Sequence, residues 1–439
     1  MPYSLRLQRL AMHGSRDMTP PQWSTVCNSA LDGEPARALR QQVPLAVRRR
    51  AGVFFTGLRL ATRLLKKAEF RARTPLVVLD PACGAGDLLL SAARRLPLGR
   101  NLEQTIAQWG QILHGRDLQP QFVVAARARL LILARHRHRA FASGDITWSS
   151  AFPNIRTGDA LRDGTLYARA DFTLLNPSFA PVLALDDCSW AAGKVNSAAL
   201  FLERAATRVR DGSRILAILP EVLRTGSRYA KWRRLISDYA KIQAIEPAGL
   251  FDNSADVDVF ILVLQKRVAK PSVISKAWLP DECRVGSKLQ DHFTVAVGPV
   301  VPYREPRTGP SRRYIHPRNV RPWQEVRRVS ETRRFSGTVF NPPFVAIRRT
   351  SRPGDKLRAV GTLILGAEPV AVENHLIVCT PKDGSVETCR HLLQVLKHPR
   401  TTTFLNLRIC CRHLTVGSVR GLPWHPHGLN SAYAQAIHS

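Results

Sequence analysis

The sequence predicts an α/β protein with a largely parallel sheet covered by helices, followed by a smaller C-terminal domain that is α+β or rich in β-strands. Apolar runs of strand length alternate with helical stretches from about residue 43 to residue 269. Several of these runs are apolar almost throughout, which is typical of strands buried on both faces. The chain has 439 residues, of which 44% are hydrophobic, so it can form two or three domains with buried cores.

Seven strands are expected, and the first, fourth and fifth of them are apolar almost throughout. The seven strands lie at residues 76–80, 111–117, 154–160, 171–176, 213–220, 241–247 and 257–266. Helical periodicity predicts helices at residues 54–68, 86–96, 119–138, 197–209 and 226–240. The last two strands are joined by about ten residues without a helical pattern, so we expect them to pair antiparallel at an edge of the sheet.

Composition separates this α/β domain, residues 43–269, from an N-terminal extension at residues 1–42, whose role the sequence does not indicate. Residues 270–330 are rich in Pro and Arg and are expected to form a linker or a nucleic-acid-binding arm. Residues 331–439 are expected to fold as a separate module. Its predicted elements are strands at 338–349, 359–365 and 369–379 and a helix at 385–398.

The charge of the chain is strongly positive. Lys and Arg number 65 against 33 Asp and Glu, which gives a formal net charge of +32. Between residues 301 and 350, twelve arginines and three glutamates give a local net charge of +9. This stretch is either a solvated linker or a segment that follows phosphates. A field of this sign attracts polyanions, and nucleic acid is the usual partner.

Cysteine usage and apolar patterning bear on the compartment. The eight cysteines include no C-x-x-C pair, so neither a zinc site nor a disulfide framework is indicated. The first residues have no uninterrupted apolar core typical of a secretion signal, and no stretch reaches about 18 apolar residues. We therefore expect a cytoplasmic protein that works at the nucleoid, without a metal and without a membrane partner.

A glycine-containing turn follows the first strand of the α/β domain. It reads Asp80-Pro81-Ala82-Cys83-Gly84-Ala85-Gly86 and leads into a helix. Glycine lets the backbone pass close to a ligand, and the N-terminus of the following helix offers free N–H groups to a carboxylate. This layout suits a bound nucleoside. A dinucleotide site is disfavoured, because its third glycine would fall at Leu89.

Two further strand ends carry polar residues. The second strand ends at Asp117, where a carboxylate can accept the hydroxyls of a ribose or can serve only as the N-cap of the next helix. The fourth strand ends in Asn176-Pro177-Ser178-Phe179. Because open α/β sheets bind ligands at the carboxyl ends of their strands, we expect Asp80, Asp117 and Asn176 to lie together.

These segments, in this order, resemble the N6-adenine DNA methyltransferases of restriction-modification systems. The family motif is Asn-Pro-Pro-Phe or Asn-Pro-Pro-Tyr, so Ser178 is a departure. The upstream segment Gly52-Val53-Phe54-Phe55-Thr56-Gly57 is similar to a motif that closes over the methionine end of S-adenosylmethionine, with Gly57 in place of the usual Pro. The resemblance covers residues 43–269 and implies a Rossmann-like methyltransferase sheet with S-adenosylmethionine as the cofactor.

The resemblance also implies roles for individual residues. The cofactor would contact Phe55, Thr56, Asp80, Pro81, Ala82, Gly84, Gly86, Asp117, Leu118, Asp159, Ala160 and Asn176. Within that set, Asp117 would hold the ribose and Asp159 the adenine. The side-chain oxygen of Asn176 and the carbonyl of Pro177 would accept the amine hydrogens of a flipped adenine, and Phe179 would stack on the base.

Contacts with nucleic acid are expected from side chains outside the strand ends. They are Trp190, Lys194, Arg312, Arg313 and Arg318. The segment Asn341-Pro342-Pro343-Phe344 matches the family motif more literally, but no β-α unit precedes it, so we interpret it as a chance match. The C-terminal module resembles, more weakly, the target-recognition domain of such methylases.

The predicted function is methylation of adenine N6 in double-stranded DNA, within a restriction-modification or phage-defence system. A restriction nuclease or a specificity subunit is a candidate partner. Two alternatives stay open. One is an enzyme of the same motif class that methylates RNA bases or protein glutamine. The other is a non-catalytic subunit of a defence complex that uses the methylase fold only to bind DNA, which the departure at Ser178 would permit.

Overall fold

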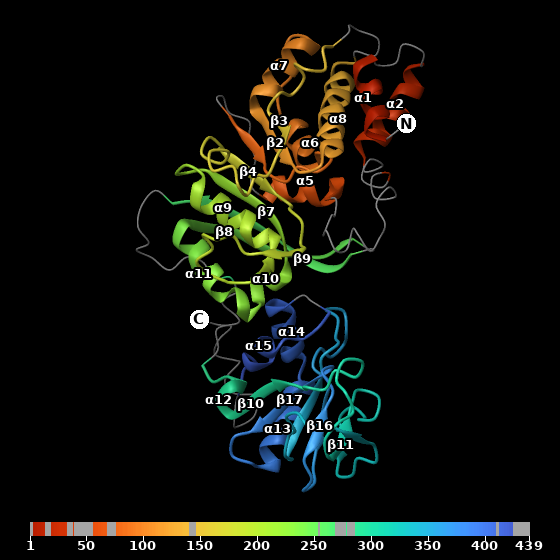
Figure 1. The fold of residues 1–439 in the computed structure, drawn as a ribbon, viewed down its shortest axis with the longest axis vertical. Coiled ribbons are helices and arrows are strands. Elements are labelled where there is room, and N and C mark those ends of the chain that lie inside the picture. The colour runs from red at the N-terminus through yellow and green to blue at the C-terminus, as the bar shows by residue number, and fades with distance from the viewer. Residues whose placement is uncertain are drawn as a thin grey trace. The chain divides into compact units, whose positions relative to one another are not determined.

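The structure is a computed structural model. In it the chain forms two compact units (Figure 1). The first consists of Met1–Leu223 and Arg228–Lys276, and the second of Arg224–Ser227 and Ala277–Ser439. None of the described helices is both long and apolar enough to cross a membrane. The structure describes residues 3–13, 19–32, 38, 56–67, 76–139, 146–252, 255–267, 278, 286–409 and 412–424.

The first unit is built on a seven-stranded sheet with the order β3-β2-β1-β4-β7-β9-β8. Pairing is parallel from β3 to β7, whereas β9 pairs antiparallel with both β7 and β8. Each of the seven expected strands is present, and the last two pair antiparallel, as their short connection predicted. The strands are β1 (Val78–Asp80), β2 (Leu113–Asp117), β3 (Ile155–Thr157), β4 (Phe172–Leu175), β7 (Arg214–Pro220), β8 (Ala240–Asp252) and β9 (Ala255–Lys266).

Strand β8 is longer than the sequence pattern indicated. We expected it to span residues 241–247 and so to end at Pro247. Register shifts on either side of this residue, between Ile242 and Ala244 and between Pro247 and Gly249, let the strand continue. Gly249 has a φ of +79°, which glycine adopts without strain. The extension carries Phe251 to a position that matters for the site.

Helices cover both halves of this sheet (Figure 1). Helices α6 and α8 pack against β1, β2 and β3, and helices α9 and α11 pack against each other and against β7 and β8. Helix α7, which fills the connection before β2, was not expected. The helices are α5 (Gly57–Lys67), α6 (Asp87–Ala93), α7 (Leu102–Ile112), α8 (Pro120–His138), α9 (Ser197–Arg208), α10 (Glu221–Thr225) and α11 (Ala230–Tyr239).

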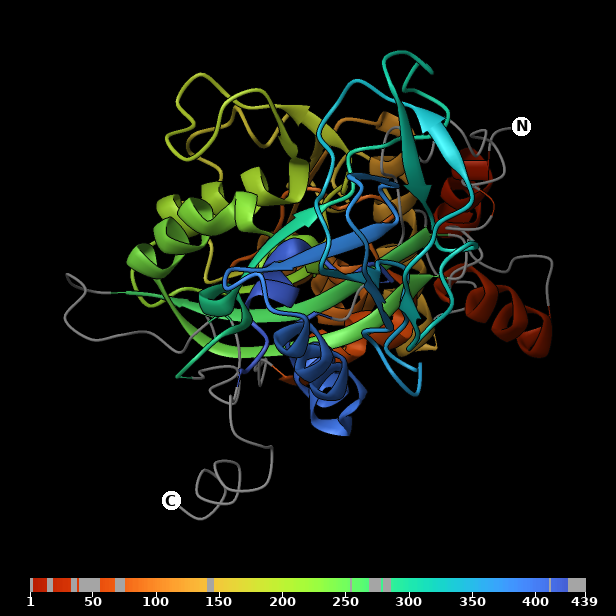
Figure 2. The ribbon, with the colours of Figure 1, turned by 90° about the horizontal axis from the view of Figure 1, so that it is seen from below.

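Two N-terminal helices, α1 (Tyr3–His13) and α2 (Pro20–Leu31), belong to the core of the first unit. Both pack against α8, and they are the red helices of Figure 1 and Figure 2. Their buried side chains include Leu7 and Trp23. The expected N-terminal extension is therefore, in its described part, a layer of this unit. Helices α1 and α2 cover the face of α8 that is turned away from the sheet, and α8 therefore has buried side chains on nearly all sides.

The second unit contains a five-stranded sheet, ordered β10-β17-β14-β15-β12, and a three-stranded sheet, ordered β13-β11-β16. Helix α13 packs against β14, β15 and β17. The strands are β10 (Phe293–Val297), β11 (Ser311–Ile315), β12 (Glu325–Val326), β13 (Thr332–Arg334), β14 (Phe344–Arg348), β15 (Gly361–Ile364), β16 (Val370–Val372) and β17 (Leu376–Pro381). The helices are α12 (Leu289–His292), α13 (Val386–Lys397), α14 (Pro399–Arg408) and α15 (Val416–Arg420).

The structure differs from the expected linker at residues 270–330. Strands β10, β11 and β12 lie in this range and pair within the second unit. The sequence pattern did not indicate strand β11, because this strand reads Ser-Arg-Arg-Tyr-Ile and only Tyr314 and Ile315 are buried. A short strand with mostly polar side chains is hard to distinguish from a solvated segment.

Candidate functional site

The turn that follows β1 is held in a tight conformation at the carboxyl end of the sheet. The Cys83 amide donates to the Arg116 carbonyl of β2 at 2.8 Å, and the Gly86 amide donates to the Cys83 carbonyl at 2.8 Å. Gly84 and Gly86 have φ values of +51° and +86°. Glycine is favoured at both positions, because a side chain is strained in this left-handed region.

We expect Gly86→Ala to destabilise the protein by roughly 1–3 kcal/mol and to weaken ligand binding at the turn. An added Cβ would lie 3.0 Å from the Cβ of Ala126 on α8, so the turn or the helix must move. Urea unfolding of the two proteins measures the difference. Gly212→Ala is the matched control, since its φ is +79° but no atom lies within 4 Å of the added Cβ. Equal losses in both variants would show that the contact with Ala126 has no effect.

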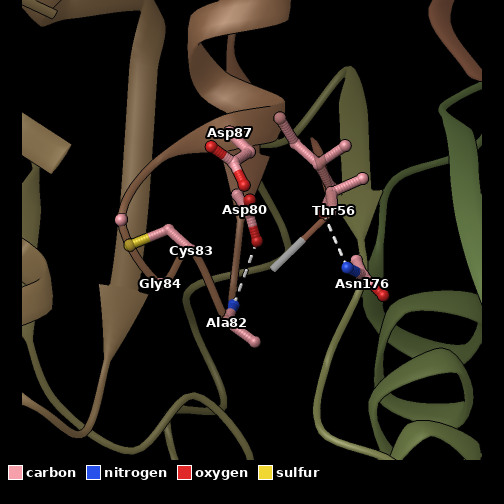
Figure 3. A pocket seen from close by; sticks show the side chains of 9 residues that line it. Thr56, Asp80, Ala82, Cys83, Gly84, Asp87 and Asn176 are labelled. Atoms are coloured by element: carbon pink, nitrogen blue, oxygen red, sulfur yellow. Dashed lines mark hydrogen bonds between the residues drawn. The ribbon is translucent and has the colours of Figure 1, made fainter. Parts of the chain in front are cut away.

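A pocket opens between this turn and the end of β4 (Figure 3). The structure brings together here five residues that the sequence predicted: Thr56, Asp80, Ala82, Gly84 and Asn176. Its other lining residues are Cys83, Ala85, Asp87 and Leu88. The pocket has a volume of about 30 Å³, which is too small to hold a whole nucleoside. A nucleoside must therefore extend from it across the strand ends.

Asp80 is the buried acid of this pocket. Its side chain is 2% exposed, and its Oδ1 accepts a hydrogen bond of 3.2 Å from the Ala82 amide. Burial raises the pKa of Asp80 to about 8, and the nearby carboxylates of Asp117 and Asp87 act in the same direction. A cationic ligand would stabilise the ionised carboxylate of Asp80, because it offsets the free-energy cost of a buried negative charge.

Asn176 projects into the same pocket from the end of β4. Its Nδ2 donates to the Thr56 Oγ1 at 2.6 Å. Its Oδ1 is buried and accepts no hydrogen bond from any residue that the structure describes. An unsatisfied buried acceptor costs about 1–3 kcal/mol, and a donor on a bound molecule would remove that cost. Thr56 thus fixes the orientation of the Asn176 side-chain amide, and the Oδ1 of Asn176 is left to accept a hydrogen bond from a ligand.

The residues after Asn176 form a turn with an aromatic wall. Pro177 is buried, and the Ala180 amide donates to the Ser178 Oγ at 3.1 Å. That hydrogen bond closes the turn at the position where the family motif has its second proline. The ring of Phe179 meets the ring of Phe251 edge-on, with centroids 5.6 Å apart. Phe251 was missed in the sequence, because β8 was expected to end before it.

The predicted ribose contact, Asp117, lies at the end of β2 and braces the glycine turn. Its Oδ2 accepts from the Gly84 amide and its Oδ1 from the Gln119 amide, both at 2.9 Å. Burial raises the pKa of Asp117. Gln119, not Asp117, occupies the N-cap position of α8, so the simple capping interpretation does not apply. The structure places Asp117 beside the pocket and not among its lining residues.

The other predicted cofactor residues that the structure describes do not line the pocket. Leu118 is 65% exposed, which is unusual for a leucine and leaves an apolar surface at the strand ends. Asp159 follows β3, and its Oδ1 accepts from the Leu161 amide at 3.0 Å. Pro81 and Ala160 are buried. Phe55 lies outside the described residues.

The structure contradicts the expected stacking of Trp190 on a target base. Trp190 is only 5% exposed, and its indole Nε1 donates to the Glu203 Oε2 at 2.9 Å. Its ring packs against the rings of Tyr229 and Trp232. The indole therefore anchors the segment after Phe179 to α9 and is not available to nucleic acid. Glu203 was overlooked because a glutamate on a helix is usually exposed.

That segment forms a small hairpin of β5 (Pro181–Leu183) and β6 (Lys194–Asn196). Lys194 is exposed on it, as a nucleic-acid contact requires. The Asn196 Nδ2 donates to the Phe179 carbonyl at 2.9 Å, which ties the hairpin to the aromatic wall.

The three predicted arginines of the second unit differ in their surroundings. Arg318 is exposed, and Arg312 is half-buried on β11. The Arg313 Nε donates to the Glu368 carboxylate at 2.6 Å and its Nη1 to the Val329 carbonyl at 3.0 Å. Of the three, Arg318 is the most accessible to a phosphate, and Arg313 already has an acidic partner.

The Asn-Pro-Pro-Phe segment at residues 341–344 does not form a comparable site. It lies in the second unit at the start of β14, and Phe344 is fully buried in the core of that unit. A buried ring cannot stack on an incoming base. The burial of Phe344 supports the interpretation of this motif as a chance match.

Comparisons with known proteins add information about the fold. No family model matches the sequence, and no curated protein matches it. The type IIL restriction-modification enzyme MmeI, solved in complex with DNA, is similar with a TM-score of 0.53 and 14% identity. The similarity covers 86% of this chain and 65% of that one. At this identity the similarity shows a shared fold, which extends over both units of the chain.

Two further solved structures are similar over about half of this chain. M.EcoKI, the M protein of a type I restriction enzyme, has a TM-score of 0.39 and 20% identity over 50% of this chain and 45% of its own. A class I S-adenosylmethionine-dependent methyltransferase from Listeria monocytogenes has a TM-score of 0.34 and 18% identity over 49% and 62%. The chain thus spans between 45% and 65% of the length of these three structures.

Proposed function

We propose that this protein transfers a methyl group from S-adenosylmethionine to the N6 amine of adenine in DNA, within a restriction-modification or phage-defence system. One observation carries the proposal. Asn176, with an unsatisfied buried acceptor, lines the same pocket as Asp80 and the glycine turn. A nucleophile held by Asn176 and a cofactor held by the turn would therefore meet at the ends of β4 and β1, which pair side by side in the sheet.

The residues around the pocket fit S-adenosylmethionine. The buried carboxyl of Asp80 suits a cationic group, and the exposed face of Leu118 suits a purine ring. We assign the sugar hydroxyls to the Asp117 carboxylate at the end of β2 and the adenine amine to the Asp159 carboxylate, which follows β3. Bound there, the cofactor supplies an electrophilic methyl group on a sulfonium. The sulfur keeps the bonding electrons when the methyl group is transferred, so this leaving group needs no acid catalyst.

The residues after β4 would prepare the amine of the target base. The lone pair of an exocyclic adenine amine is delocalised into the ring, so it is a weak nucleophile. Acceptance of both N–H hydrogens, by the Asn176 Oδ1 and the Pro177 carbonyl, favours a pyramidal nitrogen with its lone pair available. The Phe179 ring, supported by Phe251, would stack on the flipped base and offset part of the few kcal/mol of unstacking. Rate acceleration then comes mainly from orientation.

Charge favours a long polyanion as the substrate. The net charge of +32 and the twelve arginines between residues 301 and 350 supply the field that phosphate binding requires. The structural similarity to MmeI, an enzyme solved in complex with DNA, agrees with this assignment. The basic surface does not distinguish DNA from RNA, so the test includes both.

The deciding experiment incubates the purified full chain and methyl-labelled S-adenosylmethionine with duplex DNA, structured RNA or a protein extract. Digestion of the product to nucleosides identifies the modified group. We expect label in N6-methyldeoxyadenosine from DNA and none in the other two substrates. Label in RNA or protein alone would overturn the substrate. Cofactor binding without transfer to any of the three would favour a non-catalytic DNA-binding subunit instead.

A further inference from the structure

A buried arginine joins the N-terminal helices to the glycine turn. Arg129 lies on α8 and is 1% exposed. Its Nε donates to the Ala30 carbonyl in the last turn of α2 at 2.9 Å. Its Nη1 donates to the Ala85 carbonyl of the glycine turn at 2.6 Å and to the Asp87 Oδ1 at 2.7 Å. One guanidinium thus binds three groups from two segments that lie 55 residues apart in sequence.

The arrangement is rigid for chemical reasons. The guanidinium is planar and presents its donors in a fixed geometry, so the three acceptors must keep fixed relative positions. The Asp87 carboxylate is itself nearly buried, with 10% of its side chain exposed, and a buried charge that loses its partner is strongly unfavourable. A shift of α2 would therefore either break a buried hydrogen bond or pull on the turn that contains Ala85.

Hydrogen bonds on both sides of Ala85 restrict how far the glycine turn can move when α2 shifts. Ala85 stands between Gly84, whose amide donates to Asp117, and Gly86, whose amide donates to the Cys83 carbonyl. Ala85 and Asp87 both line the pocket that contains Asp80 and Asn176. A displacement of the turn would consequently change the shape of the pocket itself.

We propose that Arg129 is a positioning residue that makes the conformation of the glycine turn, and so the affinity for the cofactor, depend on helix α2. This inference rests on the proposed function, since it assumes that the turn binds S-adenosylmethionine. It gives a role to the described part of residues 1–42. Helix α2 is part of the cofactor-binding machinery, although it contributes no lining residue to the pocket.

The same helix provides a matched control. Arg135, on α8 and fully buried, donates to the Ala11 and Met12 carbonyls at 2.8 and 2.7 Å and so holds the end of α1. Both arginines fix an N-terminal helix to α8, but Arg129 also bonds to the glycine turn. Arg135→Met and Arg129→Met should therefore both lower the melting temperature, Arg129→Met by more because Asp87 also loses its charged partner, but only Arg129→Met should weaken cofactor binding.

The test uses the full chain with Arg129→Met, Arg129→Lys and Arg135→Met. Calorimetry with S-adenosylmethionine should show a Kd raised by about tenfold to a hundredfold for Arg129→Met, an intermediate Kd for Arg129→Lys and an unchanged Kd for Arg135→Met. The KM for the cofactor should rise in parallel while kcat at saturation stays the same. Without the cofactor, hydrogen exchange of the amides in residues 81–88 should be faster in Arg129→Met than in Arg135→Met.

Each outcome has a distinct meaning. Equal losses of affinity in Arg129→Met and Arg135→Met would overturn the proposal, because they would indicate general destabilisation. Unchanged affinity and exchange in a folded Arg129→Met would overturn it as well. If Arg129→Met does not fold, Arg129→Lys takes its place, because lysine lacks the planar guanidinium that reaches all three acceptors. An unchanged Kd and unchanged exchange in Arg129→Lys would then overturn the proposal. Failure of the unmodified protein to bind S-adenosylmethionine would refute the proposed function, while the exchange measurement would still test the link from α2 to the turn.

Discussion

Asn176→Ala should reduce kcat for methyl transfer by roughly 10²–10³-fold or more, with little change in the Kd for S-adenosylmethionine. The reason is that Oδ1 of Asn176 is the unsatisfied acceptor of the pocket. Its interaction with the amine matters as the nitrogen becomes pyramidal, and an interaction made only in the transition state appears in kcat. Single-turnover methylation of a DNA duplex, with cofactor affinity measured separately, checks the prediction.

The stability of this variant provides an internal control. Removal of an unsatisfied acceptor saves about 1–3 kcal/mol, which offsets the lost hydrogen bond to Thr56, so the melting temperature should not fall. Asn374→Ala is a matched comparison, because the Asn374 Oδ1 is also buried without a partner among the described residues but lies in the second unit. It should retain cofactor binding and the chemical step. Full methyl transfer by Asn176→Ala would rule out the assignment of the site.

The strands and their polar ends were predictable from the sequence for one physical reason. A strand buried on both faces must be apolar along its length, and its first polar residue then marks the end of the strand. Asp80 and Asn176 illustrate this, since each directly follows an apolar run. Because β1 and β4 pair parallel, their ends share one edge of the sheet, and the two side chains line one pocket.

The partners of buried polar groups were not predictable. Trp190 was expected at the surface, but Glu203 satisfies its indole N–H and makes its burial possible. Arg129 is one of several arginines on α8, and its acceptors, which include two backbone carbonyls, belong to segments distant in sequence. Apolar periodicity indicates which face of an element is buried, but it does not indicate which polar group in another segment pairs with a buried arginine or indole.

Asp80→Asn should weaken S-adenosylmethionine binding by roughly 10- to 100-fold at pH 8, the magnitude of one charged hydrogen bond. It should also remove the pH dependence that Asp80 causes. With a pKa of about 8 in the folded protein, Asp80 is protonated at neutral pH. A cationic ligand favours the ionised carboxylate, so binding releases a proton, and the Kd of the unmodified protein should rise by up to about tenfold for each pH unit below 8. Calorimetry in two buffers of different ionisation enthalpy counts the released proton.

The same residue affects stability with the opposite trend. Between pH 4 and pH 8 the unfolded carboxyl loses its proton while the folded one keeps it, so the folded state binds more protons. Stability without the cofactor should therefore fall as pH rises through this window, by at most about 1.4 kcal/mol per unit from Asp80. In Asp80→Asn that contribution is absent and the unfolding free energy should decline less steeply. Equal slopes for the two proteins would mean that Asp80 is ionised in the folded state, and the tightening of cofactor binding toward pH 8 would then need another cause.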